Sequence, residues 1–287
     1  MTPKKDTAIL LIHCPDQPGL VRAIAQFLAD NGGNILHFDQ HVDAQENVFF
    51  TRVEWQMEGF ALSRGELPNV FGALALKFAM RWALHFSADP HRVAILCSKE
   101  SHCLYDLLAR QESGDLPMEV PLIISNHEIL RPAAERFGIP FHHVPVTKEG
   151  KAEAEARQVE LIEAAGAETI VLARYMQILS EGLVARYPGR VINIHHSFLP
   201  AFPGARPYHS AFQRGVKIIG ATSHYVTADL DEGPIIEQDV IRVSHKLAVE
   251  DFVRNGRDLE KVVLSRALRW HLERKILSYN NKTVVFA

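Results

Sequence analysis

An asparagine, a histidine and an aspartate in the second half of the chain could together hydrolyse an amide bond. Asn193 and His195 lie two positions apart in VINIHHSFLP, whose apolar, β-branched start predicts a buried strand. Because successive side chains of a strand point to opposite faces, these two share one side. Asp231 belongs to ADLDEGP, a turn-forming stretch after a second apolar run at residues 216–226. The three side chains therefore converge if both strands end at one sheet edge.

Each of the three side chains supplies one function that hydrolysis of an amide requires. The Asn193 amide can donate a hydrogen bond to the oxyanion that forms on the carbonyl oxygen. The His195 imidazole can donate to the same oxygen and pass a proton to the leaving nitrogen. The Asp231 carboxylate either holds the imidazole in the required tautomer or orients and deprotonates the attacking water.

Taken singly, these residues also fit structural roles. An asparagine at a strand end often bonds loop backbone, an aspartate can form an Asx turn, and the chain has 15 histidines. All three together favour the catalytic interpretation. A metal site is a further alternative, with imidazole and carboxylate ligands from His195, His196, His209, His224 and Asp231. No spacing fixes two of these histidines on one helix, so we expect no metal.

Alternating strand and helix patterns precede the candidate site. The predicted strands cover residues 92–97, 119–124, 141–144 and 169–173, and the predicted helices cover residues 102–110, 129–137, 152–165 and 181–187. This alternation implies right-handed βαβ crossovers and a Rossmann-like, mostly parallel sheet in an α/β domain. After the site, residues 247–273 predict a helix with a break at Asn255-Gly256. Residues 276–286 predict a hairpin that turns at Asn280-Asn281.

The N-terminal part of the chain predicts a smaller, separate domain. Its predicted strands cover residues 7–13, 34–43, 48–55 and 82–86, and its predicted helices cover residues 20–28 and 70–78. The order βαββαβ is that of a ferredoxin-like module. The polar, proline-bearing stretch Ser87–His91 predicts the boundary, so we expect domains at residues 1–88 and 89–287.

Composition excludes several classes of protein. The net charge is −3, from 34 acidic and 31 basic residues, so no basic surface indicates nucleic acid. No apolar stretch is long enough to cross a bilayer. Cys14, Cys97 and Cys103 show no CxxC spacing, which favours a reducing compartment over disulfides or structural zinc. We therefore expect a cytoplasmic protein without nucleic-acid or membrane partners.

Two motifs carry a resemblance to a known family. The segments NIHHSFLP and LDEGPII, in this order and at this spacing, resemble the folate-dependent formyltransferase and formyl-hydrolase family. The resemblance implies that Asn193, His195 and Asp231 form the catalytic triad. In the transferases of this family the residue after the catalytic histidine is commonly proline, so His196 resembles the hydrolase branch. We expect His196 to support the site from behind, with its side chain pointing away from His195.

The same resemblance implies a folate pocket and a reaction. The segment LARYMQIL is similar to the family's pterin-binding segment, and the expected lining residues are Met176, Gln177, Leu179, Val226 and Leu230. The structural alternative makes the apolar members ordinary core residues. The implied reaction is hydrolysis of 10-formyltetrahydrofolate to formate and tetrahydrofolate, and the formate could feed purine synthesis. No cofactor is expected, because the folate is the substrate.

One sequence difference favours hydrolysis over transfer. Family members that act on a phosphorylated ribonucleotide have a glycine-rich loop after the first strand of the catalytic domain, which binds phosphate. Here that position reads CSKESH, residues 97–102, and Glu100 would repel an anion, although Lys99 could still attract one. Water is then the default nucleophile. The alternatives are a formyltransferase with an amine acceptor and a non-catalytic sensor of folate or an amino acid.

The N-terminal module resembles an ACT domain. The resemblance rests on the turn PDQPGL at residues 15–20, between the first predicted strand and helix. It implies an effector, often an amino acid, at Asp16 and Gly19. The alternative is that Asp16 caps the helix and Gly19 relieves crowding. Exposed edges of such modules often pair between chains, so we expect a homo-oligomer.

Overall fold

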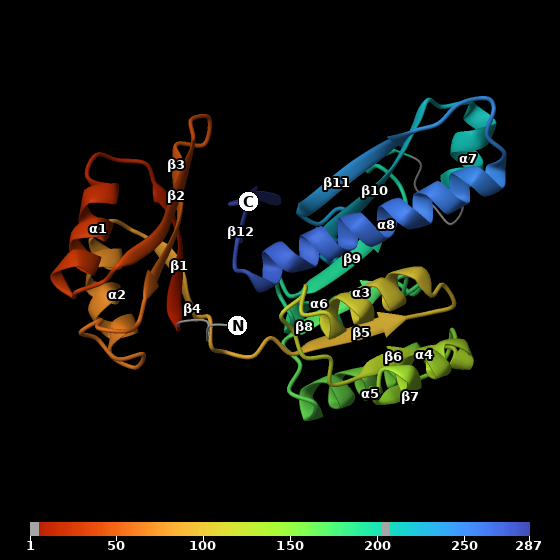
Figure 1. Ribbon diagram of the computed structural model, residues 1–287, viewed down its shortest axis with the longest axis horizontal. Coiled ribbons are helices and arrows are strands. Elements are labelled where there is room, and N and C mark those ends of the chain that lie inside the picture. The colour runs from red at the N-terminus through yellow and green to blue at the C-terminus, as the bar shows by residue number, and fades with distance from the viewer. Residues whose placement is uncertain (1–5, 202–206) are drawn as a thin grey trace. The chain divides into compact units, whose positions relative to one another are not determined.

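A computed structural model of the protein describes residues 6–201 and 207–287. The chain divides into two compact units (Figure 1). The first unit holds the chain up to Pro90 together with residues 273–279 and 284–287; the second holds residues 91–272 and 280–283. The sequence placed the whole C-terminal region in the second domain. The C-terminal strands instead group largely with the first unit, because Leu277 and Phe286 pack against Leu11 and Phe50.

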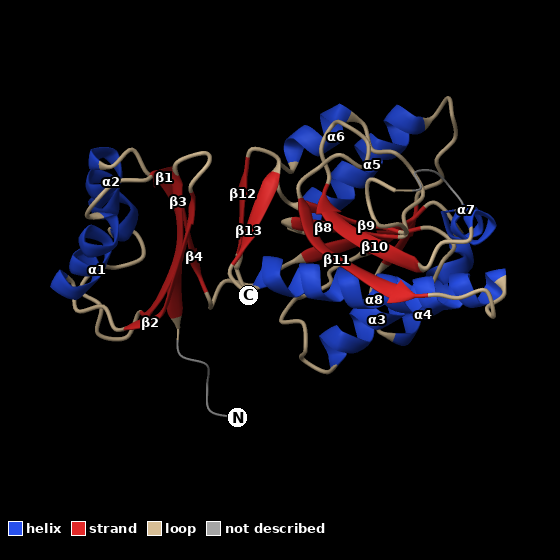
Figure 2. Cartoon of the chain, turned by 90° about the horizontal axis from the view of Figure 1, so that it is seen from above, coloured by secondary structure: helices blue, strands red, loops and turns tan. Residues whose placement is uncertain are grey.

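The first unit is a four-stranded sheet with two helices on one face (Figure 2). Its elements are β1 Thr7–Pro15, α1 Leu20–Asp30, β2 Ile35–Asp43, β3 Val48–Gln56, α2 Leu67–Lys77 and β4 Arg81–Phe86. The strand order β2-β3-β1-β4, with every pair antiparallel, confirms the predicted ferredoxin-like βαββαβ fold. The helices cover a core that includes Leu10, Ile24, Trp55 and Phe71.

The opposite face of this sheet carries the hairpin of β12 Ile276–Tyr279 and β13 Lys282–Val285. Asn280 and Asn281 connect the two strands with φ of 43° and 58°, so both central residues are left-handed. This is the turn that the asparagine pair predicted, since asparagine tolerates positive φ better than most residues.

The second unit contains a seven-stranded sheet in the order β11-β10-β9-β8-β5-β6-β7. The strands β5 Val93–Cys97, β6 Ile123–Ser125, β7 Phe141–His143, β8 Thr169–Ala173 and β9 Val191–His195 run parallel. The strands β10 Ile218–Tyr225 and β11 Ile235–Arg242 join at one edge in antiparallel pairing. This arrangement confirms the predicted mostly parallel α/β sheet.

Helices cover both faces of the second sheet, with α3 and α8 on one side and α5 and α6 on the other (Figure 2). Their bounds, with those of the shorter helices, are α3 His102–Glu112, η1 Glu128–Leu130, α4 Arg131–Arg136, α5 Lys151–Ala164, α6 Glu181–Arg186, α7 Pro207–Arg214 and α8 Val249–Leu272. Ser180 begins α6 as predicted, since its side chain accepts a hydrogen bond from the Leu183 amide. Within the described residues, no helix is both long and apolar enough to span a membrane.

Three predictions about this unit were wrong or incomplete. Helix α8 continues through Asn255-Gly256 without a break. Glycine is needed there for packing, because a Cβ on Gly256 would lie 2.1 Å from Cζ of Tyr208. Helix α7 and strand β11 were not predicted from the sequence. Strand β11 is an edge strand whose apolar Ile235, Val240 and Ile241 are substantially exposed, so it lacks a clear alternating pattern.

Candidate active site

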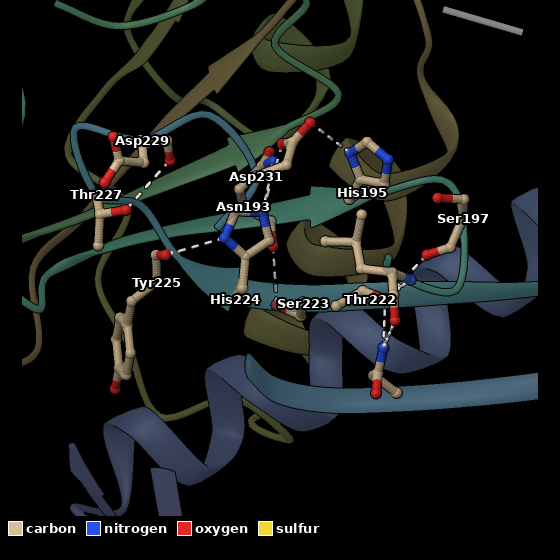
Figure 3. Close-up of polar contacts among 12 residues, drawn as sticks. Asn193, His195, Ser197, Thr222, Ser223, His224, Tyr225, Thr227, Asp229 and Asp231 are labelled. Atoms are coloured by element: carbon tan, nitrogen blue, oxygen red, sulfur yellow. Dashed lines mark hydrogen bonds and ion pairs between the residues drawn. The ribbon is translucent and has the colours of Figure 1, made fainter. Parts of the chain in front are cut away.

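The structure brings Asn193, His195 and Asp231 together at one sheet edge (Figure 3). Asn193 and His195 lie at the carboxyl end of β9, and Asp231 lies in the connection from β10 to β11. His195 Nδ1 is 3.3 Å from Asp231 Oδ2. His195 is 6% exposed, whereas the Asp231 side chain is 24% exposed, so the imidazole is shielded from water and the carboxylate is partly hydrated. The three side chains thus meet as expected, but the two strand ends do not, because β10 runs antiparallel to β9 and its last residue, Tyr225, lies opposite Ile192.

Two backbone features return the connecting segment to the end of β9. Asp231 itself has a left-handed φ of 58°. Gly233 passes directly over β10, where a Cβ would lie 1.8 Å from the Tyr225 carbonyl oxygen. The Tyr225 amide donates to the Pro234 carbonyl at 2.9 Å and closes the segment. Only glycine permits this close approach, which explains the EGP sequence after the aspartate.

His224 is a member of this cluster that sequence reasoning considered only as a metal ligand. Antiparallel pairing of β10 with β9 places His224 opposite Asn193. The His224 Nδ1 lies 2.9 Å from the Tyr225 carbonyl oxygen, which can only accept, so Nδ1 carries a proton. In the neutral ring, Nε2 then accepts from Asn193 Nδ2 at 3.2 Å. His224 thus orients the carboxamide that would face the substrate.

The Asp231 carboxylate is the negative centre of the site. Hydrogen bonding to His195 holds the pKa of Asp231 well below its usual range, despite partial burial. Its second oxygen, Oδ1, lies 3.7 Å from His224 Nε2. Asp231 therefore remains charged at neutral pH and favours a proton on the facing Nδ1 of His195.

The other ring nitrogen of His195, Nε2, is available to bind a reactant. Nε2 is buried and has no hydrogen-bond partner within the part of the chain that the structure describes. An unpartnered buried nitrogen is unfavourable in the absence of a ligand. The opposite side of the ring is held by Asp231, so Nε2 is the atom positioned to exchange a proton with a reactant.

His196 does not point away from His195 as predicted. The two ring centroids are 5.3 Å apart, and the His196 ring lies 6.2 Å from that of Tyr208. Strand β9 ends at His195, so the alternation of side chains no longer applies to the next residue. His196 also lines an apolar cavity of about 140 Å³ together with Phe198. The supporting role expected for His196 stays a prediction.

The predicted folate-lining residues divide into two groups. Met176 is 47% exposed and Leu230 is 59% exposed, so both side chains are available to a ligand. Leu179 and Val226 are partly buried and pack against the core beneath the sheet. For Leu179 and Val226, packing in the core is therefore an alternative explanation of their apolar side chains. Gln177, between Met176 and the exposed Ile178, is half-buried.

Of the metal ligands considered from the sequence, His195, His224 and Asp231 lie in the cluster described above, but their ligand atoms do not all lie within 4.8 Å of one another. Among the described residues, the one group of three whose ligand atoms lie within 4.8 Å of one another is His102, Cys103 and Glu260. The Glu260 carboxylate is already bonded to His102 Nε2 at 2.8 Å and to Tyr208 Oη at 2.7 Å. Arg174 Nε lies 3.4 Å away, and its positive charge opposes a cation. This group is a buried ion-pair network.

The predicted effector turn is exposed in the first unit. Gly19 has a φ of 94°, a left-handed conformation that by itself accounts for glycine. No side chain caps the N-terminus of α1, so Asp16 does not have the capping role considered for it. The Asp16 amide instead donates to the Asn47 carbonyl at 2.9 Å. The Asp16 side chain is exposed.

Comparisons with known proteins match these two units. Residues 91–268 match the formyl transferase family model, and residues 8–54 match the ACT domain model. The chain is 56% identical over 281 residues to formyltetrahydrofolate deformylase from Synechocystis, covering 98% of this chain and 99% of that one. A crystal structure of a formyltetrahydrofolate deformylase from Pseudomonas syringae covers 100% of this chain and 96% of that one, with a TM-score of 0.97 and 47% identity.

A transferase relative is more distant. The structure of glycinamide ribonucleotide transformylase 1 from Symbiobacterium toebii matches with a TM-score of 0.66 and 29% identity, over 71% of this chain and 98% of that one. The deformylases match over almost the full length, including the ACT domain, whereas this transformylase matches less of the chain. The chain therefore belongs to the formyltetrahydrofolate deformylase family.

Proposed function

We propose that this enzyme hydrolyses 10-formyltetrahydrofolate to formate and tetrahydrofolate. The observation that carries the proposal is the His195–Asp231 pair at 3.3 Å with Asn193 beside it. The chain also aligns with a deformylase over almost the full length of both proteins. A carboxamide, an imidazole and a carboxylate supply the groups that cleavage of a formamide needs. Side chains provide all three, so the proposal requires no cofactor.

The contacts support a specific division of roles. Asp231 faces Nδ1 of His195, so its role is to hold the tautomer in which Nε2 is the base. Water gives a proton to Nε2 as its oxygen bonds to the formyl carbon, and the imidazolium is stabilised by Asp231. Asn193 Nδ2, oriented by His224, donates to the oxyanion. The C–N bond then breaks, the leaving nitrogen takes the proton from Nε2, and formic acid and tetrahydrofolate are released.

The first loop of the second unit favours water over a phosphorylated acceptor. The N-terminus of α3 follows the carboxyl end of β5, where such folds often bind phosphate. In this chain Glu100 lies there, and Arg257 Nη2 donates to its carboxylate at 2.6 Å. An incoming phosphate would meet the Glu100 carboxylate and compete with it for Arg257, which supports hydrolysis.

Measurement of formate release tests this function. Purified enzyme is supplied with 10-formyltetrahydrofolate and no amine acceptor, and formate and tetrahydrofolate are quantified. We expect equal amounts of both products over many turnovers. Background formate release, combined with formylation of an added amine, would identify a transferase and overturn the proposal. Stoichiometric folate binding without any turnover would identify a sensor and also overturn it.

The ACT domain supports control of this reaction by a small molecule. We propose the turn at Asp16 and Gly19 as the binding position, because Asp16 is exposed and not used to cap α1. An amino acid would suit a carboxylate beside exposed backbone amides. The exposed edge strand β2 supports pairing between chains and hence a homo-oligomer. A screen of amino acids for changes in formate release would test the effector, and Asp16→Ala should abolish any response.

A further inference from the structure

We propose that Ser98 is a positioning residue for the folate pocket, which it controls by fixing the backbone of residues 174–180. This inference rests on the proposed function, because that segment is the expected pterin-binding segment. In the sequence, Ser98 belongs to the stretch that lacks the phosphate-binding glycines. The structure gives this stretch a different role, because its serine hydroxyl reaches across the sheet edge to the neighbouring loop.

The Ser98 hydroxyl both accepts and donates a hydrogen bond. Its Oγ accepts a hydrogen bond from the Met176 amide at 3.0 Å. Its proton is donated to Asn126 Oδ1 at 2.6 Å. Ser98 is 2% exposed and Asn126 is 8% exposed, so water does not compete effectively for either bond. One side chain therefore ties together the segments that follow β5, β6 and β8.

Two further side chains, both from α5, hold the same segment. Gln158 Nε2 donates to Tyr175 Oη at 2.8 Å, and the Ser180 amide donates to Glu155 Oε1 at 2.9 Å. Gln158 and Glu155 are themselves buried. The segment is thus anchored near its start, at Met176 and at its end. Of these anchors, Ser98 is the one that bonds the backbone of an expected folate-lining residue.

This anchoring explains an otherwise unfavourable arrangement. Met176 and Ile178 expose 47% and 59% of their surface although both are apolar. A segment free to move could bury them, but hydrogen bonds with the buried side chains of Ser98, Gln158 and Glu155 hold it in place. Apolar side chains held in solvent on a fixed backbone suit a flat heterocycle, because binding then costs little ordering entropy. Ser98 would therefore determine substrate affinity and leave the chemical step to other residues.

Hydrogen exchange on the substrate-free enzyme tests the structural part of the proposal. In Ser98→Ala the Met176 amide loses its buried acceptor, so its exchange should accelerate by about tenfold or more, given the cost of an unpaired buried amide. Exchange in β9 and β10 should stay as in the wild type. Ser265→Ala is the matched control, because Ser265 is also buried but donates to the Val262 carbonyl within α8.

Steady-state kinetics test the functional part. For Ser98→Ala we expect KM for 10-formyltetrahydrofolate and the Kd for tetrahydrofolate to rise about 5- to 20-fold, the range of one buried hydrogen bond, with kcat within about twofold. Ser98→Thr retains the hydroxyl and should recover most of the affinity. Ser265→Ala should match the wild type in both constants. If Ser98→Ala only destabilised the fold, fewer enzyme molecules would be active. The apparent kcat would then fall while KM stayed the same.

The outcomes separate the two proposals. If hydrogen exchange at the Met176 amide and KM are both unchanged in Ser98→Ala, the Ser98 hydroxyl fixes neither the segment nor the substrate affinity, and the inference is wrong. If kcat falls and KM stays constant, Ser98 acts on the chemical step and the inference is also wrong. If the wild type releases no formate, the proposed function fails by itself, while the exchange rate at Met176 still decides whether Ser98 anchors the segment.

Discussion

In the proposed mechanism Asn193 and His195 act on single atoms of the substrate, where one hydrogen bond to a developing charge affects the rate. We expect Asn193→Ala to lower kcat by a factor of about 10² to 10³, because the oxyanion loses a donor that needs no ionisation. His195→Ala should be at least as damaging, since it removes the base at Nε2. Formate release by the purified variants measures both effects. Near-normal turnover in both would remove these residues from the mechanism.

His224 provides a test of orientation as distinct from contact. It accepts from Asn193 Nδ2 at 3.2 Å, so in His224→Ala the carboxamide loses its fixed direction. We expect kcat to fall by about tenfold, consistent with one lost hydrogen bond, and KM to change little. Ser223→Ala is the control, because Ser223 Oγ bonds the backbone carbonyl of Asn193 and not its side chain. Equal effects of the two substitutions would contradict the orienting role.

Asp231 also affects stability as a function of pH. Its pKa in the folded protein lies well below the unfolded value of about 3.9, mainly through His195. Its charge therefore contributes stability above about pH 4, and this contribution is lost as the pH falls toward the folded pKa. We expect Asp231→Asn to be less stable than the wild type at pH 6, with a smaller difference at about pH 3.5. Urea unfolding at both values measures the difference; a constant gap would contradict the prediction.

At the scale of elements, Gly256 in α8 shows that tertiary packing can outweigh helix propensity. An alanine normally stabilises a helix relative to glycine by up to about 1 kcal/mol. Gly256→Ala should instead destabilise the enzyme by about 1 to 3 kcal/mol, because the new Cβ would lie 2.1 Å from Cζ of Tyr208. Gly72→Ala, in α2 with no heavy atom within 4 Å of the new Cβ, should be neutral or stabilising. Thermal unfolding of both variants checks the opposite signs.

At the scale of the whole molecule, the C-terminal strands complete the N-terminal unit. Leu277 is 6% exposed and packs with Leu11, Val48 and Phe50 on the sheet face that the helices do not cover. Leu277→Ala should destabilise the first unit by about 2 to 4 kcal/mol, the cost of a cavity in a core. Leu76→Ala, at a residue 85% exposed in the same unit, should have almost no effect. Denaturation of both variants, followed by tryptophan fluorescence, distinguishes these expectations.

Local patterns were sufficient where they act over a few residues. The parallel strands, the βαββαβ module and the asparagine turn follow from periodicity and from the φ preferences of single residues. Strand β11 and helix α7 were missed because an exposed edge strand and an eight-residue helix carry weak patterns. The break expected at Gly256 was wrong because its tight contact is with Tyr208, on another helix.

The sequence by itself determined the two fold types, the candidate triad and the family, because these depend on residue identity and short spacing. Only the tertiary structure decided which side chains meet. His224 pairs with Asn193 through antiparallel strands, and Ser98 bonds Met176 from the end of the neighbouring strand. The C-terminal hairpin likewise adds apolar surface to a sheet formed by the opposite end of the chain. Such contacts join residues far apart in sequence, and no local pattern encodes the partner of a long-range hydrogen bond.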